Sequence, residues 1–412
     1  MPNTTVILIA YHFPPENTVG ALRPQRFYKY LKRLGYRCHI ITAAPQGDSA
    51  SQDVTVVPDE TREFLESSRK GPAPLAVNFE KLVRKIAYPG HLGTTWSRAA
   101  AKACEEIVRN SAAHKTVLYS SFPPMGAHLA GLQAARKLKL PWIADFRDPM
   151  GIGTMLPLSN VARKALLLTE KAVVKNARFV LLTVESAREA YMKAYPEVKQ
   201  KFHVIWNGFD PESTIRALPP VDNSRKVIIH AGSLYAGRNA NVLVESIVRL
   251  RRKNSPVVPS VLLRLIGELS PESGAHKESH DQGVAEGWLE MRDEWVSQKE
   301  ALRMTQEADF LLLLQPQSKI QVPGKLFEYV QIGRPVLAVV PPESAIEWLL
   351  SRSGVPYVCL FTTDSPAEVD RKLEAFLALP NDPTAPSEWF QINFDAEQQA
   401  RQLAALIEAG SA

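Results

Sequence analysis

The chain has 412 residues, of which 45% are hydrophobic and 22% charged, and its formal net charge at pH 7 is +6. This length exceeds that of one ordinary core and predicts two domains of globular composition. No apolar run approaches the ~18 to 20 residues of a membrane span, and no basic stretch precedes the first apolar run as in a signal peptide. The cysteines are Cys38, Cys104 and Cys359. Such a sparse, odd set argues against a disulfide framework and fits a reducing cytoplasm.

The first half of the chain alternates short apolar runs with longer amphipathic segments. This pattern predicts parallel strands joined by crossover helices. Strands are expected at residues 6–10, 37–42, 116–119, 142–145, 179–183 and 202–205. Helical patterns lie between these strands, for example at residues 25–34, 96–108, 126–138 and 186–194.

A second series of the same kind begins after Pro219 and Pro220. Its strands are expected at residues 226–230, 261–266, 310–314, 336–340 and 357–361. Its helices are expected at residues 240–251, 299–308, 325–332 and 366–377, with a closing helix at 395–408. Two halves that each have a sheet predict two facing, doubly wound α/β domains. Their ligands should gather in the cleft, at the carboxyl ends of the strands.

The loop after the first expected strand, YHFPPENTVGALR at residues 11–23, is longer than a strand-to-helix connection needs. Long loops of this kind often bind ligands. Gly20 allows a close approach of the backbone, and the following helix start offers amide groups to an anion. We therefore favour a binding function over a surface loop that its prolines merely stiffen.

Two further loops follow strands of the first half. In DFRDP, residues 145–149, two carboxylates flank Arg147. They could orient ligand hydroxyl groups, or an Asp–Arg pair could fix the turn before Pro149, and the local residues leave both open. SSFPPMGAH, residues 120–128, opens a helix that its serines can cap. His128 is more typical of a helix face than of a catalyst.

Two segments of the second half resemble phosphate-binding structures. AGSLYAGRN, residues 231–239, follows a strand; its glycines allow amides to approach a phosphate, and Arg238 could bind that phosphate bidentately. In VPGKLFEYVQIGRP, residues 322–335, Lys325 and Glu328 are three residues apart in a first helical turn. A cation with free helix amides suits a diphosphate, and a carboxylate one turn later suits ribose hydroxyls. A tight turn and an ordinary salt bridge are the alternatives.

Taken together, these segments resemble the GT-B-fold glycosyltransferases of family 4, and in particular its members that act in polysaccharide and O-antigen synthesis. The resemblance covers nearly the whole chain in order, through HFPPENTVGALR, SSFPPMGAH, ADFRDP, IWNGFD, HAGSLYAGR and KLFEYVQIGRPVLA. It implies two facing Rossmann-like domains and a C-terminal helix that returns to the first. The expected divisions are an acceptor domain at 1–212, a linker at 213–222, a donor domain at 223–388 and the returning helix at 389–412.

The resemblance implies transfer of a sugar from a nucleoside diphosphate sugar, with retention of configuration and without a metal or other cofactor. Arg238 and Lys325 would contact the diphosphate, and Glu328 the ribose. The expected donor site comprises Gly20, Gly232, Ser233, Arg238, Gly324, Lys325, Leu326 and Glu328. The expected acceptor and sugar contacts are His12, Arg23, Asp145, Arg147 and Asp148. Catalysis is expected to involve Arg238, Lys325 and Asp148. The two cations can stabilise a leaving diphosphate, and Asp148 would face the sugar and the acceptor.

One position departs from the pattern of much of this family, in which a first glutamate precedes the position of Glu328 and contacts the donor sugar. Here that earlier position is Ile320. Lys319, Gln321 or a backbone group could substitute, so the identity of the donor sugar stays open.

Two other classes of function remain as alternatives. A nucleotide-sugar epimerase of similar fold would act on the nucleotide sugar alone, without a second substrate. A non-catalytic nucleotide-binding module would keep Lys325 and Glu328 and turn nothing over. Nucleic-acid binding has only the mild basic charge in its favour.

The acceptor, a glycan, a lipid-linked intermediate or a small molecule, is not identified by the sequence. Neither are the nucleoside, the sugar, the linkage and the oligomeric state. The expected location is the cytoplasm. A set of basic residues could meet an anionic membrane at its inner face, or could form a solvated helical face. These residues are Arg69, Lys70, Lys81, Arg84 and Lys85.

Overall fold

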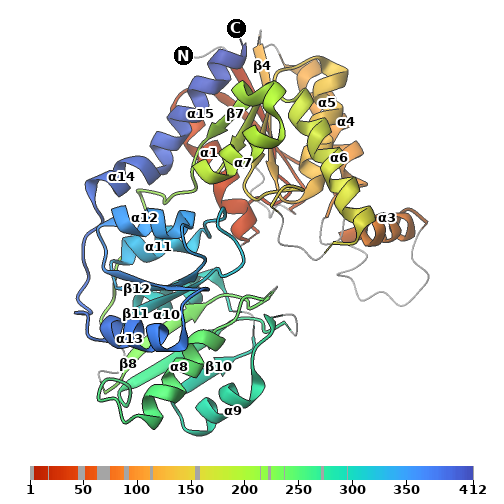
Figure 1. Cartoon of the computed structure of the whole chain (residues 1–412). Helices are drawn as coiled ribbons and strands as arrows, with labels where there is room; N and C mark the ends of the chain where they lie inside the picture. The colour runs from red at the N-terminus through yellow and green to blue at the C-terminus, as the bar shows by residue number, and fades with distance from the viewer. Residues whose placement is uncertain are drawn as a thin grey trace. The chain divides into compact units, whose positions relative to one another are not determined.

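The structure is a computed structural model (Figure 1). It describes residues 4–16, 18–44, 52–62, 75–87, 92–111, 115–153, 158–213, 215–220, 224–235, 237–270, 273–294 and 296–411. The chain forms two compact units. Unit 1 contains the described residues up to 210 together with 395–411, and unit 2 contains those from 211 to 394.

Unit 1 is built on a seven-stranded parallel sheet with the order β3-β2-β1-β4-β5-β6-β7. All six residues of β1, TTVILI, are buried, as expected of a central strand covered on both faces. The strands are β1 (Thr4–Ile9), β2 (Arg37–Thr42), β3 (Val54–Val56), β4 (Lys115–Phe122), β5 (Trp142–Phe146), β6 (Phe179–Leu182) and β7 (Phe202–Val204).

The helices of unit 1 are α1 (Val19–Arg33), α3 (Leu75–Ile86), α4 (Trp96–Asn110), α5 (Met125–Leu138), α6 (Asn160–Asn176), α7 (Glu185–Ala194), the 3-10 helix η1 (Pro196–Lys201) and α15 (Ala396–Ser411). Several of these helices, among them α1, α4 and α5, bury one side in this unit. Helix α4 packs on α5, and α5 packs on α6. Helix α15 packs along α1, with Leu403 and Ile407 in the core shared with β1 and β2.

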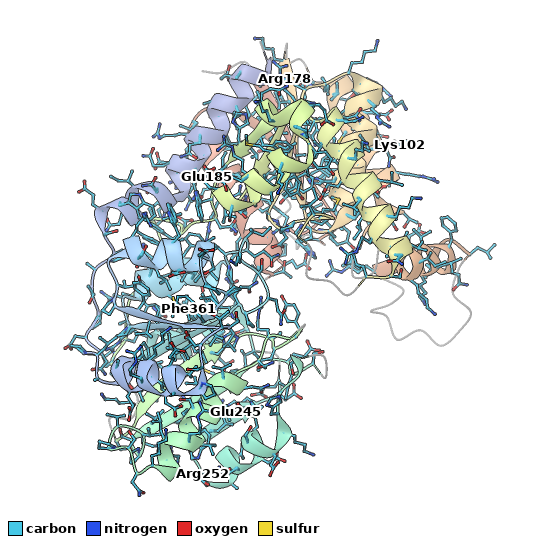
Figure 2. All side chains as sticks on the ribbon, in the orientation of Figure 1. Lys102, Arg178, Glu185, Glu245, Arg252 and Phe361 are labelled. Carbon is cyan, nitrogen blue, oxygen red and sulfur yellow. The ribbon has the colours of Figure 1, made fainter. Side chains whose placement is uncertain are left out.

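Unit 2 contains a six-stranded parallel sheet with the order β10-β9-β8-β11-β12-β13. Its strands are β8 (Lys226–Ala231), β9 (Val261–Ile266), β10 (Leu289–Arg292), β11 (Phe310–Leu314), β12 (Val336–Val340) and β13 (Tyr357–Phe361). Its helices are α8 (Asn241–Arg252), α9 (Lys277–Ala285), α10 (Gln298–Gln306), α11 (Lys325–Ile332), α12 (Ala345–Ser353), α13 (Pro366–Leu377) and α14 (Glu388–Phe394). Apolar side chains fill the interior, whereas charged residues such as Lys102 and Glu245 are at the surface (Figure 2).

Each expected strand is present, and the two sheets confirm the α/β class. The short edge strands β3 and β10 were not expected, nor were helices α9 and α12 of unit 2. Helix α3 lies between two stretches that the structure does not describe. The 3-10 helix η1 begins at Pro196.

The ends of unit 2 differ from the expected divisions. Helix α14 belongs to unit 2, because Phe390 and Phe394 pack against Phe327 of α11. Only α15, which begins at Ala396, returns to unit 1. The expected linker at 213–222, of which Thr214 and 221–222 lie outside the described residues, is tied to unit 2. Leu218 N donates to Gln306 O at 2.8 Å, and Gln306 Nε2 donates to Arg216 O at 2.8 Å.

Candidate functional site

The start of helix α11 lies beside the end of strand β8. Lys325, the first residue of α11, donates a hydrogen bond from Nζ to the carbonyl oxygen of Ala231 at 2.8 Å. Ala231 ends β8, so the ammonium group is held at the carboxyl edge of the unit 2 sheet. This is the edge at which ligands of doubly wound sheets bind.

Glycine at position 232 is required by this arrangement. Its φ is +154°, and a Cβ atom there would lie 2.2 Å from Lys325 Nζ. Gly267, just after β9, has φ +134°, and a Cβ there would lie 2.5 Å from the carbonyl carbon of Gly232. Two adjacent strands are therefore each followed by a glycine: Gly232 leaves room for the ammonium group, and Gly267 leaves room for the backbone of Gly232.

Arg238 reaches the same edge from the glycine-rich loop. Its guanidinium lies 4.8 Å from the centre of the Tyr235 ring, and Nη2 donates to Oε1 of Gln315. Gln315 directly follows β11 and in turn donates to Oε1 of Gln321 at 3.3 Å. The Gln315 amide thus joins Arg238 to the segment that precedes α11.

The positive charge of Arg238 acts on the ammonium group of Lys325. Burial first, and then the positive charge of Arg238, lower the pKa of Lys325 to about 8, while Glu328 opposes the shift. His230, buried at the end of β8, hydrogen-bonds Leu312 O through Nδ1 at 3.0 Å. Burial and the charge of Lys325 hold its pKa well below the usual value, so the imidazole is neutral. Two cations with a neutral neighbour suit an anionic ligand.

The other expected donor residues are arranged around this pair. Ser233 follows Gly232 and is half-buried, and Gly324 is the residue that precedes α11. Glu328 is half-buried one turn after Lys325. The side chain of Leu326 is fully buried, so its expected contact with the donor stays a prediction that only its backbone could satisfy.

In unit 1, Arg23 and Asp145 form a buried ion pair. The guanidinium donates from Nε and Nη2 to the Asp145 carboxylate at 2.7 and 3.0 Å, and also bonds the carbonyl oxygens of Trp206 and Ile205 at 2.6 and 2.8 Å. The Tyr119 hydroxyl donates to the same carboxylate. Asp145 raises the pKa of Arg23 although burial opposes this. Asp145 is fully buried, so this pair fixes strand ends rather than presenting groups to a sugar, contrary to the expectation.

Arg147 has a comparable structural position. It donates hydrogen bonds to the carbonyl oxygens of Gly20 at 2.7 Å, of Phe122 at 3.2 Å and of Pro123. It therefore ties the start of α1 and the end of β4 to the loop after β5. These carbonyl groups engage all three nitrogens of its guanidinium, and the expected sugar contact of Arg147 stays a prediction.

His12, Gly20 and Asp148 remain at the carboxyl edge of the unit 1 sheet. His12 contacts Glu16 at 3.1 Å, and Glu16 also pairs with Arg62 at 2.9 Å. A Cβ atom on Gly20 would lie 3.0 Å from the His12 ring, so glycine lets the ring pack on the first turn of α1. Asp148 is half-buried and acts electrostatically on its neighbour Arg147.

The loop after Asp148 is held by a buried carboxylate. Glu170 of α6 accepts hydrogen bonds from the amides of Gly151 and Ile152 at 2.7 and 3.2 Å, and from the hydroxyls of Tyr191 and Tyr195 at 2.7 and 2.8 Å. Sequence reasoning missed this anchor, because an isolated Glu on a helix gives no local signal. Gln315 was also missed, although a polar residue that ends an apolar strand was a usable clue.

His128 is buried and hydrogen-bonds the Ser120 hydroxyl at 2.8 Å. Burial, and to a lesser extent Arg147, lower its pKa to about 3. It is a neutral core residue, in agreement with the sequence analysis.

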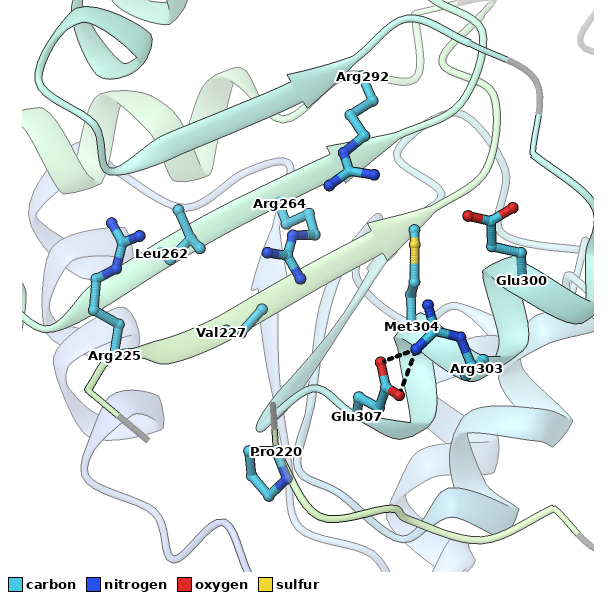
Figure 3. Close-up of a pocket in the computed structure, with 10 residues that line it drawn as sticks. All are labelled: Pro220, Arg225, Val227, Leu262, Arg264, Arg292, Glu300, Arg303, Met304 and Glu307. Carbon is cyan, nitrogen blue, oxygen red and sulfur yellow. Dashed lines mark hydrogen bonds and ion pairs between the residues drawn. The ribbon is translucent and has the colours of Figure 1, made fainter. Parts of the chain in front are cut away.

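A cavity of about 270 Å³ lies elsewhere in unit 2, between α10 and strands β8 and β9 (Figure 3). Three of its arginines form ion pairs: Arg264 and Arg292 share Glu290 at 2.7 Å each, and Arg303 pairs with Glu307 at 2.7 Å. Arg225 donates to the carbonyl oxygen of Gly287 at 2.8 Å. None of the expected site residues lines this cavity.

Comparison with known proteins shows the fold. HepE of Anabaena in complex with UDP and glucose is 14% identical, with a TM-score of 0.64, covering 98% of this chain and 99% of that chain. Sucrose-phosphate synthase from Thermosynechococcus elongatus is 14% identical, with a TM-score of 0.62 and 98% of each chain covered. WaaG, a glycosyltransferase involved in lipopolysaccharide biosynthesis, is 13% identical, with a TM-score of 0.56 and 98% of each chain covered.

The chain therefore has the two-domain α/β fold of these GT-B structures. No protein-family model and no curated protein matches its sequence. In the described part of the chain, no helix is both long enough and apolar enough to cross a bilayer. Among the same residues, no three His, Cys, Asp or Glu side chains gather as metal ligands.

Proposed function

We propose that this protein is a retaining, metal-independent glycosyltransferase of family 4 that uses a nucleoside diphosphate sugar. The observation on which the proposal rests is the convergence of Lys325 and Arg238 on the glycine-lined edge of the unit 2 sheet. Two cations beside a backbone without side chains suit a diphosphate, and the fold shared with solved glycosyltransferases supports the assignment.

In this proposal unit 2 binds the donor. The ammonium of Lys325 and the guanidinium of Arg238 bind the diphosphate, Glu328 accepts hydrogen bonds from the ribose hydroxyls, and Ser233 and Gly324 contribute backbone groups. When the bond between the sugar and the diphosphate breaks, negative charge develops on the departing phosphate oxygen. Preorganised cations stabilise this charge, which is why the proposed chemistry uses no metal.

Unit 1 is proposed to bind the acceptor and the sugar, through Asp148 and His12 at its sheet edge. The proposed acceptor is a hydroxyl of a glycan, a lipid-linked intermediate or a small molecule in cell-envelope or natural-product synthesis. The proposed location is the cytoplasm, with contact to the inner membrane face. UDP is the first nucleotide to test, because HepE was solved with UDP and with UDP-glucose.

A product assay tests this proposal against its two alternatives. The purified chain is incubated with UDP-, GDP- and dTDP-sugars, with and without a panel of hydroxyl acceptors, and the products are identified by mass spectrometry and NMR. The proposal predicts a glycoside of unchanged anomeric configuration that forms only when an acceptor is present. The proposal would be contradicted by conversion of the nucleotide sugar alone into its epimer. It would also be contradicted by nucleotide binding without turnover of any combination of donor and acceptor.

A further inference from the structure

Helix α3 presents an apolar stripe to solvent. Leu75, Phe79, Leu82 and Ile86 are spaced by four, three and four residues, which places them along one side of a helix. They are 89%, 61%, 55% and 48% exposed. Val77, two residues after Leu75 and therefore on the opposite side, is 1% exposed. The helix thus docks through one side and exposes four large apolar side chains on the other.

The exposed side of α6 combines apolar and basic residues. Val161 and Leu168 are each 60% exposed. The basic residues of this helix with exposed positions are Arg163, Lys164, Lys171 and Lys175. The single acidic residue of α6, Glu170, is fully buried in its hydrogen bonds with the loop at 151–152 and with two tyrosines. The exposed side of α6 therefore has positive charge that no acid of the same helix balances.

Both helices belong to the same part of unit 1. Helix α6 packs on α5, and α5 packs on α4. Helix α3 precedes α4 in the same connection between β3 and β4. The sequence of α3 also contains three basic residues, Lys81, Arg84 and Lys85, and one acid, Glu80. The side chains of Glu80 and Arg84 lie outside the described residues, as do the expected basic residues Arg69 and Lys70.

We propose that the exposed sides of α3 and α6 bind an anionic lipid bilayer. The apolar stripe of α3 would enter the boundary between headgroups and acyl chains, and the lysines of α6 would lie over the anionic headgroups. Exposed apolar side chains beside unbalanced positive charge are the composition that binds at such an interface. Pairing of this surface with the same surface of a second copy would place these lysines opposite one another, because α3 and α6 expose no described acid.

Vesicle sedimentation tests this proposal with the full chain. We expect binding to vesicles of 30% phosphatidylglycerol in phosphatidylcholine, weak binding to phosphatidylcholine alone, and weaker binding to the anionic vesicles as salt is raised from 0.1 to 0.5 M. Phe79→Ser with Leu82→Ser should lower the partition coefficient at least tenfold, because it removes two exposed apolar side chains from the buried face. Lys164→Gln with Lys171→Gln should lower it about fivefold for each lysine.

Matched controls come from exposed positions of unit 2. Val284→Ser with Ile392→Ser removes apolar side chains that are 50% and 58% exposed, and Lys277→Gln with Lys299→Gln removes the same charge. Both should leave the partition coefficient within twofold of the parent. Circular dichroism and UDP titration establish that each variant is folded, and UDP affinity should not change, so the outcome is independent of the proposed donor site.

Three results would overturn the proposal. One is absence of binding to the anionic vesicles by the folded parent chain. Another is equal loss in the α3, α6 and control variants. The third is sedimentation velocity showing a dimer that Phe79→Ser with Leu82→Ser dissociates, because the stripe would then be covered by a second copy of the chain.

Discussion

Replacing Gly232 by alanine should remove the nucleotide-binding geometry while leaving the fold in place. The new Cβ atom would lie 2.2 Å from Lys325 Nζ, well inside van der Waals contact, and 3.7 Å from His230 Nε2. The ammonium group is the end of a flexible side chain, so it can move away. We therefore expect the variant to fold with Lys325 displaced from Ala231.

The size of the effect follows from the contact that is lost. A charge-assisted hydrogen bond to a diphosphate contributes about 1.5 to 3 kcal/mol, so Gly232→Ala should weaken UDP binding by roughly 10- to 150-fold. The positive φ of residue 232 adds a stability cost of about 1 to 2 kcal/mol, because side chains rarely adopt that conformation.

Gly287 provides the matched control. Its φ is +73°, and a Cβ atom there would have no atom within 4 Å. Gly287→Ala therefore also replaces a positive-φ glycine, but without a collision at the proposed site. We expect only Gly232→Ala to lose UDP affinity.

Isothermal titration with UDP and thermal unfolding of the parent and both variants provide the measurement. If Gly232→Ala binds UDP as tightly as Gly287→Ala does, the ammonium of Lys325 does not contact the diphosphate. Unfolding of Gly232→Ala alone would show that the loop geometry, rather than the side chain of Lys325, is what this glycine maintains.

Four further predictions address the charges and the two sheet edges. UDP affinity should fall about tenfold between pH 7 and pH 9, because the ammonium form of Lys325 binds the diphosphate and the pKa of Lys325 is about 8. Lys325→Arg should flatten this pH dependence, which titrations across pH would measure. A steeper fall of UDP affinity in the Lys325→Arg variant would refute the assignment of Lys325 to the diphosphate. Asp148→Asn should keep UDP affinity within twofold and lower turnover about tenfold or more; unchanged turnover would leave Asp148 a structural residue. Transfer should persist in EDTA, and complete loss restored by manganese or magnesium would contradict the proposed mechanism. Arg23→Ala should lower the free energy of unfolding by about 3 to 5 kcal/mol, since the buried carboxylate of Asp145 is left without its cation. Replacement of an exposed arginine, Arg163→Ala, should change the free energy of unfolding by less than about 0.5 kcal/mol. Equal melting temperatures of these two variants would exclude a structural role for the Arg23–Asp145 pair.

Much of the fold was predictable because each core strand has a local signature. Segments such as Phe310–Leu314 are uninterrupted apolar runs between helical patterns, which only a buried parallel strand explains well. The short strand Val54–Val56 was missed, since three half-exposed residues at a sheet edge give no pattern. The place of α14 depends on packing of Phe390 and Phe394 against Phe327, which no local rule specifies.

The candidate site was predictable where a residue type has one plausible use. Gly232, Lys325 and Arg238 could be named from the sequence because glycine at a strand end and a cation at a helix start both suit an anionic ligand, and the structure places the three at one sheet edge. The loop DFRDP left two interpretations open, because a carboxylate at a strand end is equally suited to a sugar and to a buried arginine. The long-range partners of Asp145 and Arg147, which are Arg23 and the carbonyl groups of other loops, decide between these uses. Sequence distance hides such partners.

The central claim is that Lys325 and Arg238 bind one diphosphate, and titration of UDP and GDP against single variants tests it most directly. Lys325→Ala and Arg238→Ala should each weaken binding of the preferred nucleotide by roughly 10- to 150-fold. Glu328→Gln, which can still accept a ribose hydrogen bond, should lose less affinity than Glu328→Ala. If the folded Lys325→Ala, Arg238→Ala and Glu328→Ala variants all bind as tightly as the parent, the donor site is not at this edge of the unit 2 sheet.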